Sequence, residues 1–290
     1  MIKPLVGIIV ILLMSSALIV AGSQGSVYVP RVPLFAICAG IGFIMHWLAF
    51  IPSYYFQTEH YFDLTGSLSY ISAVTVAVLM HPLLDLRGLL IAILIAIWAI
   101  RLGRFLFLRV KKAGHDRRFT ELKTRFWRYL FTWTLGGAWV FITMAAALAS
   151  ITSMTQRPLG IWVGIGLLFW IVGFSIEVIA DRQKTEFRRD ASNAEQFITT
   201  GLWKYSRHPN YFGEIVLWLG IAMIAFPTLV GWQYAALVSP IFVTFLLIKV
   251  SGVKLLEESG RKRWGSDPTY QKYIANTSVL LPMPNRSELN

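Results

Sequence analysis

Cysteine, acidic residues and paired histidines are scarce in this chain of 290 residues. Its single cysteine, Cys38, excludes an intramolecular disulfide and any zinc or iron–sulfur site built from several cysteines. The five histidines are scattered, and no two of them lie three or four residues apart. The sequence therefore has no histidine box for a membrane di-iron centre and no HExxH zinc motif, and we expect no metal.

Soluble nucleotide-binding motifs are also missing. The chain has no Walker loop and no GxGxxG after a strand, and helix packing explains the Gly164-Ile165-Gly166 stretch better. Charged residues make up only 14% of the chain, against about 25% in soluble domains. Both absences argue against a soluble nucleotide-binding fold.

Long apolar runs dominate the composition, with 56% hydrophobic residues and a mean hydropathy of +0.58. Eight runs approach or exceed the roughly 20 residues that cross a bilayer core. They lie near residues 5–21, 33–52, 67–84, 88–108, 129–151, 159–180, 211–229 and 232–250. We predict an all-α fold, a polytopic membrane bundle with seven or eight transmembrane helices in one catalytic domain, 1–290. The first run resembles a signal peptide, but we expect it to be retained as a span.

Positive charge is concentrated in three polar segments, which we expect to be loops at 109–128, 181–210 and 254–290. Of the 27 lysines and arginines, eight lie in 109–128, six in 181–207 and six in 254–286. With eight spans these segments share one side with the N-terminus, and the positive-inside rule makes that side cytoplasmic. The net charge of +12 then reflects topology and anionic lipid, and we expect no nucleic-acid partner. A bacterial inner membrane is the expected location.

The segment Arg207–Glu214, which reads RHPNYFGE, lies where a basic loop meets an apolar helix. Pro209 suits the first helical position, because its missing N–H would be unpaired there anyway. His208 would then lie near the N-cap. Asn210 and Glu214 are four residues apart and share one helix face. This pattern indicates a grip on a polar ligand at the membrane edge.

Two further groups of polar residues lie near helix ends. The spacing of Glu177, Asp181, Lys184 and Arg188 places them on one stripe of a continuous helix. Arg101 and Arg104 occupy the fourth span, where we expect Arg101 to face the bundle interior and to pair with Glu177 or Glu214. The alternative is a structural ion pair between helices, but several helices directing charge to one side favour a site.

A third cluster follows the second span and contains Tyr54, Tyr55, Gln57, Glu59, His60 and Asp63. It is either a loop helix that balances charge or a group of hydrogen-bond donors at the membrane boundary. In the second case it would meet the polar end of a lipid-like substrate.

Three stretches of the chain, residues 49–70, 177–188 and 201–214, resemble the steroid 5-alpha-reductase family, in particular its bacterial membrane branch. The similarity covers residues 45–282. The last stretch is shared with sterol reductases and with isoprenylcysteine carboxyl methyltransferases, which bind S-adenosylmethionine. The resemblance implies reduction by NADPH of a carbon–carbon double bond conjugated to a ketone, as in a 3-oxo-4-ene steroid or a similar lipid enone.

The resemblance also implies residue roles. Asn210 and Glu214 fit the family's cofactor grip, as do Asp181 and Arg188, whereas Glu177 stands where human members have Asn. Gln57 and Glu59 fit the family's substrate-side Gln–Glu pair with a different spacing. The family's paired tyrosine falls near Arg101, so the proton donor is unassigned.

We therefore expect two groups of site residues. The cofactor-binding group is Asn210, Glu214, Asp181, Arg188, Arg104, Arg117, Arg118, Arg207, His208, Tyr211 and Glu177. The substrate group has Glu59 and Gln57 as catalytic residues and Tyr54, Tyr55 and Asp63 as substrate contacts. We expect Glu59 to be a neutral acid, since desolvation raises the pKa of a carboxyl group in an apolar pocket. Arg117 and Arg118 would meet phosphates, or would only set topology.

Two other functions stay open. One is a membrane methyltransferase of the isoprenylcysteine or phospholipid type that uses S-adenosylmethionine. The other is a non-enzymatic lipid-binding membrane protein. The abundance of arginine on three loops and the Gln57–Asp63 segment favour the reductase, with a hydrophobic small-molecule substrate and membrane lipid as partners.

Overall fold

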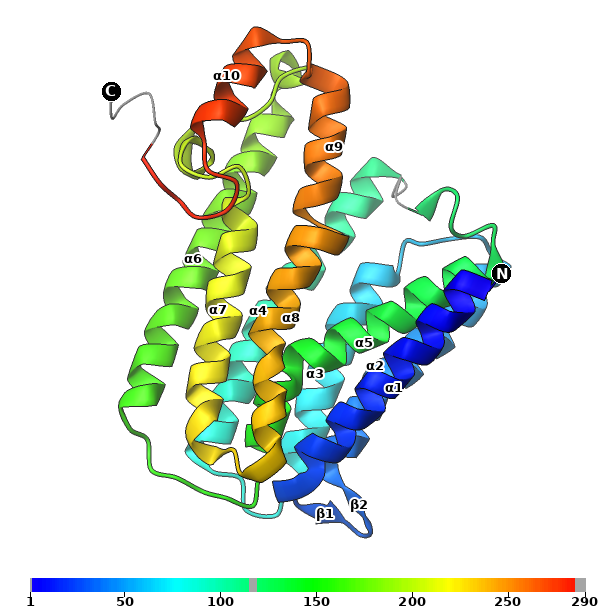
Figure 1. The fold of residues 1–290 in the computed structure, drawn as a ribbon, viewed down its shortest axis with the longest axis vertical. Helices are drawn as coiled ribbons and strands as arrows, with labels where there is room; N and C mark the ends of the chain where they lie inside the picture. The colour runs from blue at the N-terminus through cyan, green and yellow to red at the C-terminus, as the bar shows by residue number, and fades with distance from the viewer. Residues whose placement is uncertain (1, 115–118, 285–290) are drawn as a thin grey trace. The chain divides into compact units, whose positions relative to one another are not determined.

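A computed structural model of the chain describes residues 2–114 and 119–284, and this part is almost entirely helical (Figure 1). Its long apolar stretches confirm the predicted all-α polytopic membrane bundle. Eight helical stretches of the described residues are long and apolar enough to cross a membrane: Ile2–Gly25, Leu34–Tyr55, Phe62–Met80, Leu86–Lys112, Phe126–Ile151, Ile161–Arg189, Pro209–Thr228 and Gly231–Trp264.

The described residues contain ten α-helices and two short strands. The α-helices are α1 (Ile2–Gly22), α2 (Leu34–Tyr55), α3 (Phe62–Met80), α4 (Leu86–Ala113), α5 (Phe126–Ile151), α6 (Ile161–Arg189), α7 (Pro209–Ala225), α8 (Val238–Phe245), α9 (Val253–Trp264) and α10 (Pro268–Asn276). Two short strands, β1 (Tyr28–Val29) and β2 (Val32–Pro33), pair antiparallel between α1 and α2.

The third and eighth spans differ from the sequence prediction. The third begins at Phe62 and ends at Met80, because Phe62 N–H donates to the Glu59 carbonyl and Pro82 disfavours helix at the residue before it. The eighth is interrupted: a 3₁₀ turn precedes α8, and a π-helical turn, Leu246–Val250, separates it from α9. The polar segments expected as loops are partly helical, since α6 continues to Arg189 and 254–290 contains most of α9 and all of α10.

The chain forms two compact units. Unit 1 comprises Met1–Val163 and Ala222–Ser239, and unit 2 comprises Gly164–Ile221 and Pro240–Asn290.

In unit 1, α5 is the central helix. The most apolar stretch of α5 is 89% buried, and the helix packs against α1, α2, α3 and α4. Small residues permit this: a Cβ added to Gly137 would lie 3.0 Å from the Phe43 Cα and 3.1 Å from the Gly42 carbonyl oxygen. The backbones of α2 and α5 therefore approach closely.

Arg87, in the first turn of α4, is almost completely buried in unit 1. Its guanidinium donates to the carbonyl oxygens of Ile224 and Pro158, each at 2.7 Å. The buried Arg87 guanidinium thus joins three segments of unit 1, and it gives these backbone carbonyl oxygens a hydrogen-bond donor without water.

In unit 2, α6 and α7 lie side by side and meet through glycines (Figure 1). A Cβ added to Gly213 would lie 2.5 Å from the Gly173 carbonyl oxygen and 2.7 Å from the Glu177 nitrogen. The two helices make a second glycine contact further along, where a Cβ on Gly220 of α7 would lie 2.5 Å from the Gly166 carbonyl oxygen of α6. This close approach places the polar stripe of α6 beside the first turns of α7.

Candidate functional site

The first polar cluster is built where α7 begins. Pro209 is the first residue of α7 and His208 precedes it, as the sequence predicted. The Asn210 side-chain amide donates to Asp181 Oδ1 at 3.1 Å. The predicted stripe of α6 is also continuous, because the helix runs unbroken from Ile161 to Arg189.

Three carboxylates of this cluster are buried. Glu177, Asp181 and Glu214 are 2%, 5% and 9% exposed. Ionised carboxylates are costly to bury, so several of them at one place are more typical of a functional site than of packing alone.

Glu257 of α9 joins the cluster and was not identified from the sequence. Its Oε2 accepts from Arg207 Nη1 at 2.7 Å and its Oε1 accepts from His208 Nε2 at 2.9 Å. The His208 ring stacks on Tyr211 with the centroids 5.7 Å apart. Gly252 allows this arrangement, since a Cβ there would lie 2.8 Å from the Tyr211 ring. One carboxylate thus fixes the two residues that open the RHPNYFGE segment.

Burial lowers the pKa of His208 below its ordinary value of 6.5, and the charges of Lys184 and Arg207 lower it further, while Glu257 opposes the shift. The ring is therefore neutral near neutral pH and, with Glu257 as acceptor, carries its proton on Nε2. Its Nδ1 is buried and has no hydrogen-bond partner among the described residues, and the same holds for Arg207 Nε. The cluster thus offers a buried acceptor and a buried donor to a polar ligand.

Hydrogen bonds to backbone carbonyls hold the chain beside the RHPNYFGE segment in place. Trp203 Nε1 donates to the Ala180 carbonyl at 3.1 Å, and Lys184 Nζ lies 4.5 Å from the Trp203 ring centroid. Tyr273, whose pKa is raised by burial, donates to the Trp203 carbonyl at 2.7 Å. The segment near the C-terminus runs alongside, with Arg207 N–H donating to the Ser278 carbonyl at 2.8 Å.

The other predicted cofactor residues are less well supported. Arg188 is exposed at the end of α6, and Arg104 is exposed on α4 in unit 1. Arg117 and Arg118 lie outside the described residues. The Arg101 guanidinium lies 5.3 Å from the Phe105 ring centroid. A hollow of about 310 Å³ beside α6 has none of the predicted residues in its lining, which is Gln183, Glu186, Phe187, Asp190, Asn193, Thr200 and Gly201.

The second polar cluster lies in unit 1 around Glu59. Its side chain is 1% exposed and accepts from Lys123 Nζ at 2.7 Å. Tyr129 is buried nearby, and its hydroxyl donates to the Thr58 carbonyl at 2.6 Å. An ammonium at this distance favours an ionised carboxylate, and the neutral Glu59 that we expected stays a prediction. No local spacing in the sequence connects Lys123 with Glu59, which lies 64 residues earlier.

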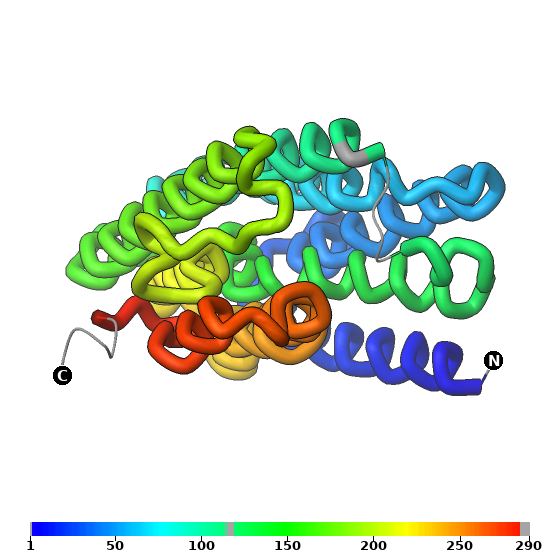
Figure 2. Tube along the Cα trace, turned by 90° about the horizontal axis from the view of Figure 1, so that it is seen from above, coloured from blue at the N-terminus to red at the C-terminus, as the bar shows by residue number. Residues whose placement is uncertain are grey.

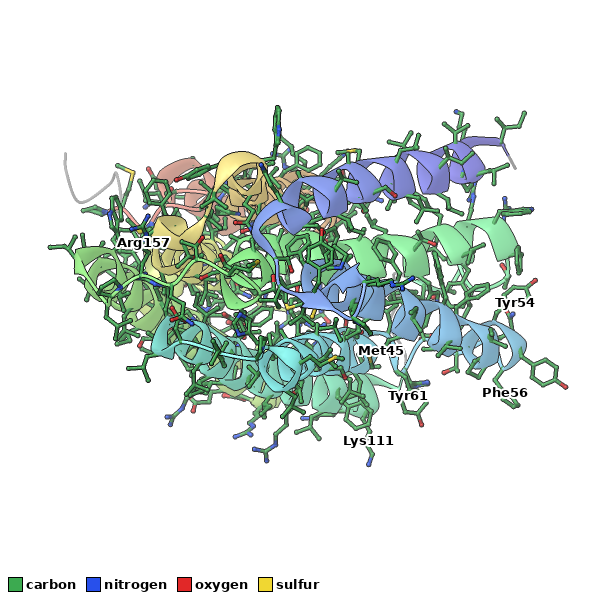
Figure 3. All side chains as sticks on the ribbon, turned by 90° about the horizontal axis from the view of Figure 1, so that it is seen from below. Met45, Tyr54, Phe56, Tyr61, Lys111 and Arg157 are labelled. Carbon is green, nitrogen blue, oxygen red and sulfur yellow. The ribbon has the colours of Figure 1, made fainter. Side chains whose placement is uncertain are left out.

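Gln57 does not converge on Glu59. It is exposed, its φ is +51°, and its side-chain amide donates to the Tyr54 carbonyl at 2.6 Å. Tyr54 packs against Phe50 and Phe126, whereas Tyr55 is 79% exposed. Neighbouring Phe56 and Tyr61 point outward, as does Lys111 of α4 (Figure 3).

Asp63 lies in the first turn of α3, before the predicted start of the third span. Its Oδ2 is 3.9 Å from Arg109 Nη2. The carboxylate also suits its position near the helix N-terminus, where the helix dipole favours negative charge.

In the described residues, eight helices are long and apolar enough to cross a membrane, and a buried polar cluster lies at the start of one of them. Together they define a multi-pass membrane protein with a candidate site for a polar ligand. The chain belongs to the DUF1295 family, described as "Protein of unknown function", whose model matches residues 49–277.

Curated relatives confirm the resemblance to steroid 5-alpha-reductases. The chain is 30% identical over 70 residues to the 3-oxo-5-alpha-steroid 4-dehydrogenase 1 of Bos taurus, covering 24% of this chain and 27% of the relative. It is 29% identical over 117 residues to the enzyme of the same name from Rattus norvegicus, covering 40% of each. An uncharacterized Schizosaccharomyces pombe protein is 28% identical over 102 residues, covering 28% of this chain and 30% of the relative. The matches thus span less than half the length of each relative, and no solved structure matches the chain significantly.

Proposed function

We propose that the protein is an NADPH-dependent membrane reductase that saturates the carbon–carbon double bond of a 3-oxo-4-ene steroid or a similar lipid enone. The observation that carries the proposal is the buried cluster at the start of α7. There the Asn210 amide bonds to Asp181, and His208 presents an unpartnered nitrogen among the described residues. The names of the two mammalian relatives, both 3-oxo-5-alpha-steroid 4-dehydrogenases, supply the reaction class.

The cofactor-side residues suit a dinucleotide in their chemistry. Asn210, Asp181 and Glu214 supply the amide and carboxylate groups that bind ribose hydroxyls and a carboxamide. Arg207 supplies guanidinium donors for phosphate. The fit rests on two buried atoms that have no hydrogen-bond partner in the described part of the chain, His208 Nδ1 and Arg207 Nε. NADPH, when bound, supplies the hydride that adds to the β carbon of the enone.

The residues at the substrate carbonyl must stabilise negative charge. As the β carbon gains hydride, the electron pair of the double bond moves toward the carbonyl oxygen, and the α carbon then takes a proton. We assign the carbonyl end to Lys123 held by Glu59, since the ammonium is a charged donor that the bond to Glu59 Oε2, at 2.7 Å, keeps in position. Preorganised donors of this kind lower a barrier by about 3 kcal/mol.

Ligand-dependent thermal stability in detergent tests the proposal. The protein is heated with NADPH, with NADH and with S-adenosylmethionine, and NADPH consumption is then followed with a 3-oxo-4-ene steroid. We expect NADPH to raise Tm more than NADH does, and the steroid to accelerate NADPH consumption. Stabilisation by S-adenosylmethionine alone would identify a methyltransferase, and no response to any nucleotide would favour a non-enzymatic lipid-binding protein.

A matched pair of variants links binding to the cluster. Asn210→Ala removes the amide that donates to Asp181, and should weaken NADPH binding about ten- to a hundredfold. Asn276→Ala is the control, because this half-buried side chain donates its amide N–H to the Lys272 carbonyl within α10, away from the cluster. Equal NADPH affinity of the two folded variants would remove Asn210 from the site.

A further inference from the structure

A hollow of about 270 Å³ lies in unit 1 at the beginnings of α1 and α5. Its lining is basic and aromatic and contains no carboxylate. The lining residues are Lys3, Pro4, Arg125, Phe126, Trp127 and Arg128. Phe126 also packs against Tyr54, but none of the three cations of the lining belongs to the clusters described above.

Two helix N-termini meet at this hollow. The helices α1 and α5 lie side by side and run in the same direction from Ile2 and Phe126 (Figures 1 and 2). They approach closely near Gly7, where a Cβ would lie 2.6 Å from the Phe131 ring. Each helix N-terminus carries about half a positive charge, and Arg125, the N-cap of α5, forms no side-chain cap bond. The helix dipoles thus add to the charge of the side chains.

The three cations of the hollow are available to a ligand. In the described part of the chain, no carboxylate forms an ion pair with Lys3, Arg125 or Arg128. All three side chains are exposed. Three clustered positive charges with no acidic neighbour repel one another, and an anion at their centre would remove that repulsion.

The surroundings of the hollow are apolar, which identifies the kind of anion. Ile2 is 75% exposed, Val6 is 51% exposed and Phe126 is 40% exposed. Only 17% of the most apolar stretch of the first span is buried. Trp127 lines the hollow itself, and tryptophan is enriched at the level of lipid headgroups. A ligand with both a negative headgroup and acyl chains matches this surface.

We propose that this hollow binds the phosphodiester headgroup of an anionic phospholipid, whose acyl chains lie along the exposed face of α1. The side chains of Lys3, Arg125 and Arg128 contact the phosphate oxygens, with the N-termini of α1 and α5 facing the same charge. The site is separate from the proposed reductase chemistry and does not depend on it.

Native mass spectrometry of the protein in neutral detergent tests the proposal. Phosphatidylglycerol, phosphatidylcholine and glycerol 3-phosphate are titrated separately. The variant Lys3→Gln/Arg125→Gln/Arg128→Gln is compared with the control Lys111→Gln/Lys112→Gln/Lys272→Gln, which removes three exposed cations elsewhere. We expect phosphatidylglycerol to bind wild type and control alike, and the hollow variant about a hundredfold more weakly, or about fivefold per cation.

Three results would overturn the proposal. Equal binding of phosphatidylcholine would show that the hollow does not select for the net negative charge of the lipid headgroup. Competition by glycerol 3-phosphate at the concentrations effective for the lipid would show that the acyl chains are not needed and that the site takes a free phosphate. An equal loss in the control would show that net charge and not the hollow is responsible. If the triple variant does not fold, the single variants Arg125→Gln and Arg128→Gln must each lose about fivefold, and unchanged affinity in both refutes the site.

Discussion

Glu257 provides a sharp test of how the RHPNYFGE segment is held. Its carboxylate accepts from Arg207 at 2.7 Å and from His208 at 2.9 Å, and the three side chains are 16%, 12% and 5% exposed. Glu257→Ala leaves both donors without that acceptor. Hydrogen bonds to charged groups contribute about 1.5–3 kcal/mol each, and breaking a buried pair costs about 3–5 kcal/mol. We expect a loss of about 3 kcal/mol in the free energy of unfolding.

Thermal unfolding in detergent measures this loss. An unfolding entropy of about 2 cal/mol/K per residue gives about 0.6 kcal/mol/K for the whole chain, so about 3 kcal/mol lowers Tm by about 5 °C. NADPH affinity should fall about tenfold, because the segment loses its fixed position. Glu257→Gln should cost less: the amide oxygen still accepts from Arg207, and the neutral His208 ring can change tautomer to accept from the amide N–H.

The control is Glu258→Ala, which removes the same charge from the next, exposed position of α9. Its Tm and NADPH affinity should match the wild type. If Glu257→Ala behaves like Glu258→Ala, the carboxylate between Arg207 and His208 contributes nothing, and the account of the segment is wrong.

Three further predictions follow from the same structure. Gly213→Ala places a Cβ 2.5 Å from the backbone of α6 and should lower Tm by several degrees. The control Gly164→Ala, with no atom within 4 Å of its Cβ, should be neutral or slightly stabilising, and equal effects of the two variants on Tm would contradict the glycine contact. Because the pKa of His208 is lowered in the folded state, the unfolded state takes up the histidine proton first as the pH falls. The contribution of neutral His208 to the free energy of unfolding is therefore complete above pH 6.5 and is lost below pH 6.5. His208→Gln should flatten the change in Tm between about pH 7.5 and pH 5.5. Glu59→Gln should lower enone turnover about a hundredfold with little change in NADPH affinity, and near-wild-type turnover would place the carbonyl end elsewhere.

Much of the fold could be predicted because membrane helices follow a local rule. Length and apolarity identify a span from about 20 consecutive residues, and proline placement identified the start of α7 at Pro209. The same local periodicity placed Asn210 and Glu214 on one face and Glu177 and Asp181 on another. These predictions needed no knowledge of which helices are neighbours.

The partners of these residues could not be predicted in this way. Glu257 lies 50 residues after Arg207, and Lys123 lies 64 residues after Glu59, so no periodicity relates them. Gln57 was expected at the substrate end from the resemblance to a Gln–Glu pair and its place beside Glu59 in sequence, but a turn with φ of +51° directs its amide back to the Tyr54 carbonyl. Sequence proximity does not determine side-chain direction in a turn.

The sequence by itself thus determined that the chain is a multi-pass helical membrane protein with polar residues at the ends of its spans, since both features depend on residues close together in the chain. Only the tertiary structure decided which charges meet. Glycine contacts between α6 and α7 bring Asn210 to Asp181, and the break before α9 brings Glu257 to His208. Buried charges are stable only beside a suitable partner, and the packing of distant helices chooses that partner.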